Sequence, residues 1–181
     1  ERIAGVEHGV GVLVELVVNR VELPHRLATD SVYLDGVQDP GNVGTILRTA
    51  AAAGIRHVAA SAATAAFWSP KVLRSAMGAH FALRFLYESV TPEQAAAAFA
   101  SEVIAADVDG GSELFSSPWG AGPTLWLFGA EGQGLSAGAR SCAQLCLRIP
   151  IAPGVDSLNV AAAAAVCLFE QRRRRLAGSA S

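Results

Sequence analysis

From residue 31 onward the sequence repeats one unit: a short apolar run, a loop rich in glycine and polar residues, and a segment with helical spacing. Residues 32–34 predict a strand, residues 42–53 a helix, and residues 57–60 a second strand, with Gly54 as the helix stop. Strands that are separated by helices pair in parallel, because the crossover helix returns the chain to the same end of the sheet. The pattern therefore predicts an α/β fold built on a parallel sheet.

The same signals continue to the end of the chain. Thr91, Pro92 and Glu93 supply an N-cap, a first-turn proline and an acidic first turn for a helix that runs to about residue 100. The other predicted elements are a strand at 10–18 followed by a linker, a short helix at 70–75, strands at 80–85, 103–108, 124–128 and 145–149, and a closing helix at 158–172.

Length and composition limit the class of protein. The chain has 181 residues, of which 51% are hydrophobic and 17% charged, so it can bury one core and is too apolar to be disordered. Its longest apolar run, residues 160–169, is about half of the roughly 20 residues that a membrane span needs. No signal-peptide pattern opens the sequence. We expect a soluble, cytoplasmic protein.

Cysteine usage and charge add two expectations. Cys142, Cys146 and Cys167 are odd in number and include no CxxC pair, so we expect reduced, mostly buried thiols and neither a disulfide framework nor a zinc ribbon. The net charge of -2 does not give the global cationic field of an autonomous nucleic-acid binder.

Three loops that follow predicted strands are the candidate site, because ligands bind at the carboxyl ends of strands in open α/β sheets. The first is residues 35–44, which lead into a helix that carries Arg48. If Asn42 caps this helix, a phosphate near the helix start can meet both backbone N–H groups and the Arg48 guanidinium. The structural alternative is a capped turn followed by a surface arginine.

The second loop, residues 128–134, contains three glycines that permit close backbone approach. It does not match the GxGxxG or Walker patterns, so a phosphate-cradling dinucleotide site is not indicated. Glu131 would repel phosphate and could hold a cationic or hydroxyl-bearing ligand. The alternative for Glu131 is a solvated loop carboxylate.

The third segment is residues 149–159, before an alanine-rich helix. Asp156 or Ser157 is expected to cap that helix. A nucleophilic role for Ser157 is not supported, because no GxSxG elbow surrounds it and no histidine is placed as its base. The histidines, at positions 8, 25, 57 and 80, lack metal-site spacing, so we expect structural roles and no metal. The arginines at 172–175 are either a nucleic-acid contact or a solvated helix end.

Taken together, these segments resemble the three motifs of the SpoU, or TrmH-like, family of RNA ribose 2'-O-methyltransferases within the SPOUT superfamily. The resemblance covers about residues 31–175 and includes a connecting segment at residues 71–81. The matching motifs are Asp39-Pro40-Gly41-Asn42-Val43-Gly44 with Arg48, Gly129-Ala130-Glu131-Gly132, and Ile149-Pro150 with Ser157-Leu158-Asn159-Val160.

The resemblance implies a SPOUT catalytic domain over residues 31–181, preceded by a connector at residues 1–30 with the substrate-binding domain absent. The implied domain has helices on both faces of the parallel sheet, a C-terminal trefoil knot, and a homodimeric state. It would bind S-adenosylmethionine through Gly129, Ile149 and Leu158. This cofactor has no phosphate, so it needs apolar walls and main-chain partners, which agrees with the missing phosphate loops.

The resemblance also implies the reaction, which is methyl transfer to a ribose 2'-hydroxyl of rRNA or tRNA, with rRNA favoured. Its active-site residues would be Arg48, Asn42, Glu131, Ser157 and Asn159. Because a guanidinium stays protonated, we expect Arg48 to pair with a substrate phosphate that helps take the hydroxyl proton, while the cation stabilises the developing oxyanion.

Two alternatives from other classes remain at this point. One is a non-enzymatic RNA-binding or assembly module that keeps the SPOUT fold, and the other is a Rossmann-like nucleotide-binding enzyme. Retention of Arg48, Glu131 and Asn159 together argues against the first, and the absence of phosphate loops argues against the second. Binding of S-adenosylmethionine separates the methyltransferase from both.

Overall fold

The computed structural model describes residues 15, 17, 18, 26–99 and 101–178. Its centre is a parallel sheet with the strand order β3-β2-β1-β6-β4-β7-β5. The strands are β1 (Ser31–Asp35), β2 (His57–Ala60), β3 (Arg84–Glu88), β4 (Glu102–Ala106), β5 (Ser112–Glu113), β6 (Thr124–Gly129) and β7 (Leu145–Arg148).

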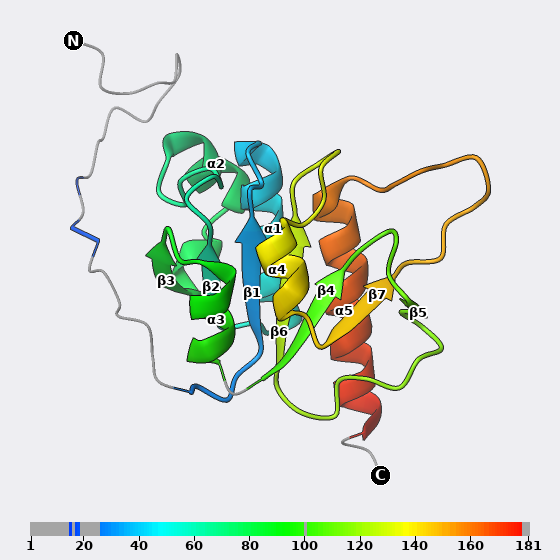
Figure 1. Ribbon diagram of the computed structural model, residues 1–181. Coiled ribbons are helices and arrows are strands. Elements are labelled where there is room, and N and C mark those ends of the chain that lie inside the picture. Colours follow the sequence, from blue (N-terminus) through cyan, green and yellow to red (C-terminus); the bar gives the residue numbers. More distant parts are fainter. Residues whose placement is uncertain (1–14, 16, 19–25, 100, 179–181) are drawn as a thin grey trace.

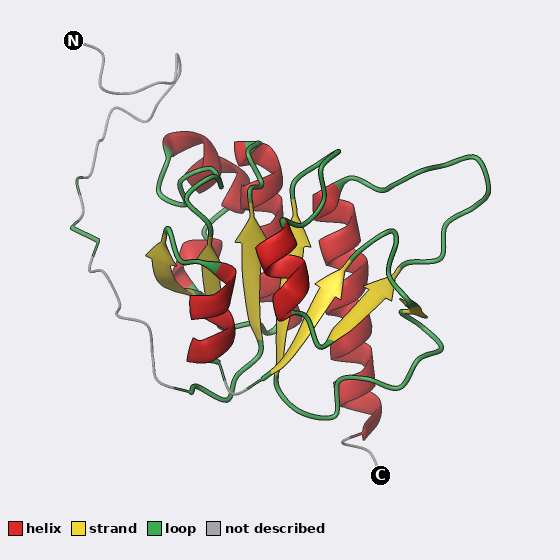
Figure 2. Ribbon diagram, in the orientation of Figure 1, coloured by secondary structure: helices red, strands yellow, loops and turns green. Residues whose placement is uncertain are grey.

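Helices cover both faces of this sheet. They are α1 (Pro40–Ala53), α2 (Pro70–Ala76), the 3-10 helix η1 (Ala79–Phe81), α3 (Pro92–Ala98), α4 (Ala137–Cys142) and α5 (Val160–Gly178). Helices α3 and α4 lie on one face, whereas α1, α2 and α5 lie on the other (Figures 1 and 2). The predicted parallel α/β fold with helices on both faces is confirmed.

The central strands β1 and β6 are buried along nearly their whole length because helices cover both faces of the sheet. Val32 and Leu34 of β1 pack toward the α1 and α5 side, whereas Tyr33 between them packs toward the α3 and α4 side. Trp126 and Leu127 divide between the two cores in the same way. The sheet therefore separates two hydrophobic cores and fixes the position of every loop at its edges.

Several element boundaries differ from the sequence-based expectation. The strand expected at residues 80–85 begins only at Arg84, because Gly78 turns the chain in the left-handed region and residues 79–81 form η1. There the His80 ring stacks on Phe85 at 4.8 Å between centroids and its Nε2 lies 2.9 Å from the Phe67 carbonyl. The strand expected to reach Val108 ends at Ala106, and α3 ends at Ala98.

Two elements were not predicted at all, namely the short helix α4 and the two-residue strand β5. The expected strand at 10–18 falls almost wholly outside the described residues, as does the connector at 1–30. Of the three cysteines, Cys167 is buried, but Cys142 and Cys146 are only half-buried. Within the described part of the chain, no helix is long and apolar enough to span a membrane.

Three arginines at the end of α5, residues 173–175, form ion pairs within the domain. Glu170 accepts hydrogen bonds from Arg173 at 2.7 Å and from Arg174 at 2.8 Å. Arg174 also donates to the carbonyls of three residues in the β5–β6 connection and lies 4.5 Å from the ring centroid of Trp119; the carbonyls belong to Leu114, Phe115 and Ser117. Arg175 bonds Asp30 at 3.1 Å. The expectation of a solvated helix end is therefore wrong for Arg174 and Arg175, and a nucleic-acid contact stays a prediction.

Candidate active site

The three loops singled out from the sequence leave the sheet at the same edge. They follow β1, β6 and β7, whose carboxyl ends point the same way, and β1 lies beside β6 with Asp35 opposite Gly129 (Figure 1). The loop after β7 returns over this edge to the start of α5. Residues separated by more than 100 positions in the sequence therefore meet there.

Asn42, Glu131 and Asn159 form one hydrogen-bonded cluster at this edge. Glu131 Oε1 accepts from Asn42 Nδ2 and from Asn159 Nδ2, both at 2.7 Å, and Asn159 Nδ2 lies 3.1 Å from Asn42 Oδ1. Each loop contributes one member, so the cluster ties the three motifs together. Glu131 Oε2 accepts no hydrogen bond from the described residues, and this exposed oxygen is free to bind a hydroxyl group.

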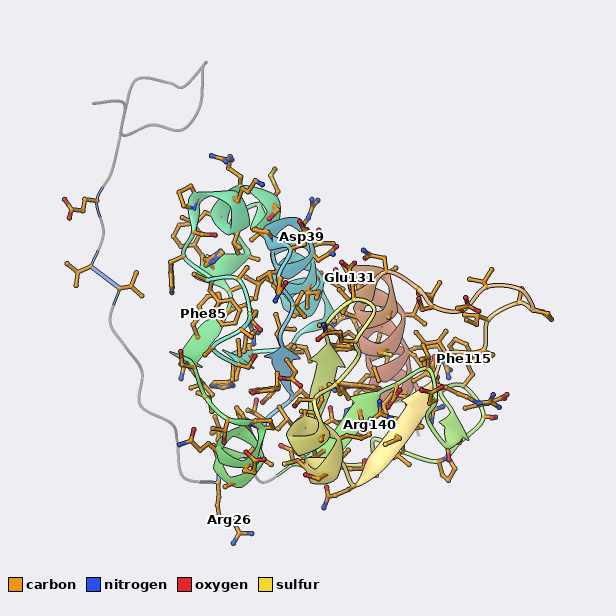
Figure 3. The ribbon with its side chains drawn as sticks, turned by 45° about the horizontal axis from the view of Figure 1, so that its top comes forward. Arg26, Asp39, Phe85, Phe115, Glu131 and Arg140 are labelled. Atoms are coloured by element: carbon orange, nitrogen blue, oxygen red, sulfur yellow. The ribbon has the colours of Figure 1, made fainter. Side chains whose placement is uncertain are left out.

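Helix ends position two of these side chains. Asp39 caps α1 by accepting from the Asn42 backbone at 2.8 Å, with Pro40 in the first turn. Asn159 Oδ1 accepts from the backbone of Ala161 at 2.9 Å and so caps α5. The condition that Asn42 caps α1 is therefore not met, and the cap expected at Asp156 or Ser157 is wrong. Figure 3 shows Asp39 and Glu131 at the same end of the molecule.

The glycines of the second motif serve close packing of the loop itself. A Cβ on Gly129 would lie 2.2 Å from the backbone of Gly134, which forms an isolated bridge with Ala130. Gly132 and Gly134 have φ of +77° and +68°, which L side chains rarely adopt. This tight loop holds Glu131 over the start of α1. Glycine is therefore needed at position 129 because the backbone of Gly134 packs directly against it.

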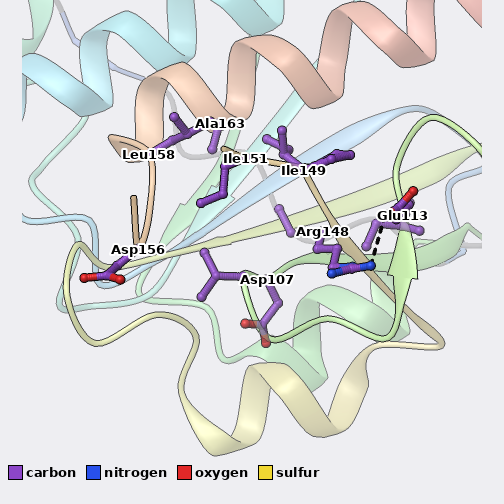
Figure 4. A pocket seen from close by; sticks show the side chains of 12 residues that line it. Asp107, Glu113, Arg148, Ile149, Ile151, Asp156, Leu158 and Ala163 are labelled. Atoms are coloured by element: carbon purple, nitrogen blue, oxygen red, sulfur yellow. Dashed lines mark hydrogen bonds and ion pairs between the residues drawn. The ribbon is translucent and has the colours of Figure 1, made fainter. Parts of the chain in front are cut away.

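A pocket of about 250 Å³ lies between the carboxyl ends of β4 and β7 and the loop that precedes α5 (Figure 4). Its apolar wall includes Ile149 and Leu158, two of the three residues predicted to bind the cofactor. Gly129 does not line it. Leu158 is the chain neighbour of Asn159, so the pocket and the polar cluster share one loop.

Polar residues that no sequence motif indicated also line this pocket. Asp107 directly follows β4 and Glu113 ends β5, and each carboxylate pairs with an arginine: Asp107 with Arg140 at 2.5 Å and Glu113 with Arg148 at 3.0 Å. The available signal was position, because Asp107 directly follows a strand at the ligand-binding edge. Asp156 also lines the pocket, although it does not cap α5.

Arg48 and Ser157 lie outside the hydrogen-bonded cluster. Arg48 is six residues beyond Asn42 on α1, which places it about 9 Å further along the helix and about 120° around it. It is exposed and pairs with none of the described residues. Ser157 is also exposed, and its hydroxyl bonds none of them.

The described histidines have structural surroundings. His57 is buried at the start of β2, and its pKa is lowered by burial and by the neighbouring charge of Arg84. His80 packs between aromatic rings. In the part of the chain that the structure describes, no group of three metal-ligating side chains comes together.

Comparisons with known proteins decide the family. The sequence profile of the SpoU rRNA Methylase family matches residues 30–169. The chain belongs to the SpoU family. The SpoU domain is 35% identical over 175 residues to the 23S rRNA (guanosine-2'-O-)-methyltransferase RlmB of Bordetella pertussis, covering 93% of this chain and 68% of the relative. The predicted family membership is thereby confirmed.

Two further similarities extend this result. An uncharacterized tRNA/rRNA methyltransferase of Synechocystis is 40% identical over 86% of this chain and 57% of its own length. The AdoMet-bound rRNA methyltransferase of Sinorhizobium meliloti superposes with a TM-score of 0.76 at 33% identity, covering 86% of the SpoU domain and 61% of that chain. The SpoU domain thus spans between half and two thirds of the length of several of these relatives.

Proposed function

We propose that the SpoU domain transfers a methyl group from S-adenosylmethionine to a ribose 2'-hydroxyl of rRNA or tRNA, with rRNA favoured. The observation that carries this proposal is the Asn42–Glu131–Asn159 cluster, which joins all three family motifs beside a pocket of suitable chemistry. The RlmB relative is named for this reaction on 23S rRNA, and two structural neighbours are complexes with the cofactor.

The pocket residues fit S-adenosylmethionine. Leu147, Ile149, Ile151 and Leu158 offer apolar contacts for an adenine ring, and the Asp156 carboxylate can accept from ribose or amino groups. When bound there, the cofactor supplies an electrophilic methyl group on a sulfonium. The donor set contains no lysine or P-loop, in agreement with a ligand that has no phosphate.

The residues of the chain would then bind and orient the nucleophile. Glu131 Oε1 keeps Asn42 and Asn159 in place, and this fixes the carboxylate at the edge where the ribose must bind. Arg48 pairs with a substrate phosphate, which takes the hydroxyl proton, and the guanidinium stabilises negative charge on the attacking oxygen. The oxygen–carbon bond forms as the carbon–sulfur bond breaks, and the electron pair stays on sulfur.

A homodimer belongs to the same proposal. Arg48 is about two helical turns from Asn42 and does not join the cluster of its own chain, so a second copy can bring it to a substrate. Phe169 and Leu176 are seven residues apart on one side of α5, and both are exposed, which offers an apolar contact face. Light scattering should give twice the chain mass at micromolar concentration, and a monomer that is active would refute this part. We propose the cytoplasm as the compartment, where free thiols stay reduced.

The test combines binding with product analysis. Calorimetric titration of S-adenosylmethionine should show one site per chain, and labelled methyl groups should pass to rRNA. Because 2'-O-methylation removes the nucleophile of alkaline RNA cleavage, the product should resist alkali at the labelled nucleotide. Glu131→Gln should keep cofactor binding and lose transfer. RNA binding without cofactor binding would favour the non-enzymatic module instead.

A further inference from the structure

The basic residues of the SpoU domain are unevenly distributed. Between Asp39 and Glu88 the sequence has five basic residues and no acidic one, although the whole chain has 14 basic and 16 acidic residues. All five are exposed, and none forms an ion pair with a described residue; they are Arg48, Arg56, Lys71, Arg74 and Arg84. By contrast, arginines 140, 148, 173, 174 and 175 all pair with carboxylates. The unpaired cations are therefore available to a polyanion.

Two of these cations lie among exposed apolar side chains on α2 and η1. Val72 and Ala76 are the buried face of α2, so Lys71, Leu73, Arg74 and Met77 occupy the opposite, solvent-facing arc. Leu73 is 41%, Met77 72% and Phe81 94% exposed. We call Lys71, Leu73, Arg74, Met77 and Phe81 the α2 surface.

Helix α2, which carries most of the α2 surface, packs directly against the helix that begins at the candidate active site. Ser75 Oγ donates to the carbonyl of Pro40 at 3.0 Å, and a Cβ on Gly44 would lie 1.8 Å from Ser75 Oγ. Helix α2 thus packs against the first turn of α1, where Asn42 begins the polar cluster. The α2 surface includes the solvent-facing side of this same helix, which lies next to the start of α1.

We propose that the α2 surface binds single-stranded RNA that flanks the methylated nucleotide, with Lys71 and Arg74 on backbone phosphates and Phe81 stacked on a base. Cations without carboxylate partners match a phosphate backbone, and aromatic platforms accept any base by its face. Met77 ends α2 in the left-handed conformation, with φ of 48°, and its side chain is 72% exposed. This inference rests on the proposed RNA methyltransferase function.

The test measures binding of a labelled oligouridylate of about 12 nucleotides across a series of salt concentrations. Lys71→Ala/Arg74→Ala should reduce the slope of log affinity against log salt by about 1.4, because each phosphate contact on a single strand contributes about 0.7. The matched control is Arg56→Ala/Arg84→Ala, which removes two unpaired, exposed arginines at the amino ends of β2 and β3, at the opposite edge of the sheet. This control should change the slope much less.

The stacking contact has its own readout. Phe81→Ala should weaken oligouridylate binding at least about fivefold without changing the salt slope. Phe115→Ala, which removes an exposed phenylalanine from the β5–β6 connection, should leave binding unchanged. Calorimetry with S-adenosylmethionine on every variant checks that the fold and the pocket are intact.

Three results would overturn the proposal: equal losses in the two double variants, no oligouridylate binding by the wild-type chain at low salt, or binding of phosphatidylserine vesicles in place of RNA. These results are separable from failure of the proposed function. If the wild type transfers methyl groups but the α2 variants match their controls, only the docking surface is wrong. If α2 variants lose RNA while the wild type binds no cofactor, only the enzymatic assignment is wrong.

Discussion

Asn159 donates to Glu131 at 2.7 Å with its Nδ2 while its Oδ1 caps α5. One amide side chain thus ends the third motif, starts the C-terminal helix and fixes a carboxylate of the second motif. Its amide nitrogen holds Glu131 and its amide oxygen caps α5, so different substitutions can test the two roles separately.

Asn159→Asp keeps an oxygen for the α5 cap but replaces the donor by a second carboxylate oxygen facing Glu131. We expect near-normal stability near pH 4, where one of the two carboxyl groups takes up a proton, lower stability at pH 8, where both are charged and repel, and about 100-fold slower methyl transfer. Asn159→Ala should lose the cap as well, at about 0.5–2 kcal/mol at both pH values. Urea unfolding at the two pH values and single-turnover transfer provide the measurements. Equal behaviour of the two variants would contradict this division of roles.

Arg48→Ala should leave cofactor affinity intact and slow methyl transfer about 100-fold to 1000-fold, because one preorganised charge-stabilising group is lost. Arg48→Lys should also be severely impaired, since an ammonium cannot reproduce the planar two-point contact with phosphate. Single-turnover transfer beside a cofactor titration tests both, with Arg56→Ala as the control for loss of an exposed arginine. Loss of cofactor binding would move Arg48 to the cofactor side of the site.

Gly129→Ala should displace the loop that carries Glu131, because the added Cβ would lie 2.2 Å from the Gly134 backbone. Overpacking of this kind costs about 1–3 kcal/mol, and we expect transfer to fall more than tenfold as Glu131 moves. Gly111→Ala is the matched control, since its Cβ would meet nothing within 4 Å. Thermal unfolding and transfer rates compare the two, and an active, stable Gly129→Ala protein would show that the loop tolerates the methyl group.

Because of Glu170, the free energy of unfolding should depend on pH in the acid range. Hydrogen bonds from Arg173, followed by those from Arg174, lower the pKa of this buried carboxyl to about 2. A lowered pKa means that the stabilisation is complete above the unfolded-state value near 4.5 and is lost as pH falls toward 2. Glu170→Gln should therefore destabilise the protein at pH 7 by about 1–3 kcal/mol and clearly less at pH 3.

Urea unfolding of wild type and Glu170→Gln at pH 7 and pH 3 measures this difference. Glu113→Gln is the control, because its partner Arg148 and Glu113 itself are both about half exposed and such pairs contribute little. A Glu170→Gln penalty that is the same at both pH values would contradict the ion-pair explanation.

The meeting of the three motifs followed from the sequence, because the carboxyl ends of parallel strands share one edge wherever the helices intervene. The caps did not follow, although Pro40 in the first turn of α1 already indicated that Asp39, and not Asn42, precedes the helix. Likewise, Asn159 directly precedes the apolar run of α5, and this position indicated Asn159, rather than Asp156 or Ser157, as the cap.

Other features depend on tertiary contacts that no local pattern encodes. The short helix α4 has small and polar residues without helical periodicity, so only the Ser136 cap signals it. Residues 80 and 81 are apolar enough for a strand, but the packing of His80 against Phe85 and Phe67 holds them in η1. The trefoil knot and the homodimer stay predictions.

Helix α5 also determines when this chain can reach its native state during synthesis. Gln171 joins Thr124, 47 positions earlier, and Arg175 joins Asp30, 145 positions earlier, so α5, which is synthesised after β1–β7, closes contacts with β6 and with the residue directly before β1. Contacts at such separation form slowly, because long loops must close before the contacts can stabilise the fold. A nascent chain that stops before α5 leaves the donors of Thr124 and Trp126 without Gln171. The domain therefore cannot complete these contacts before α5 has been synthesised, and termination before α5 should deliver the chain to chaperones and proteases.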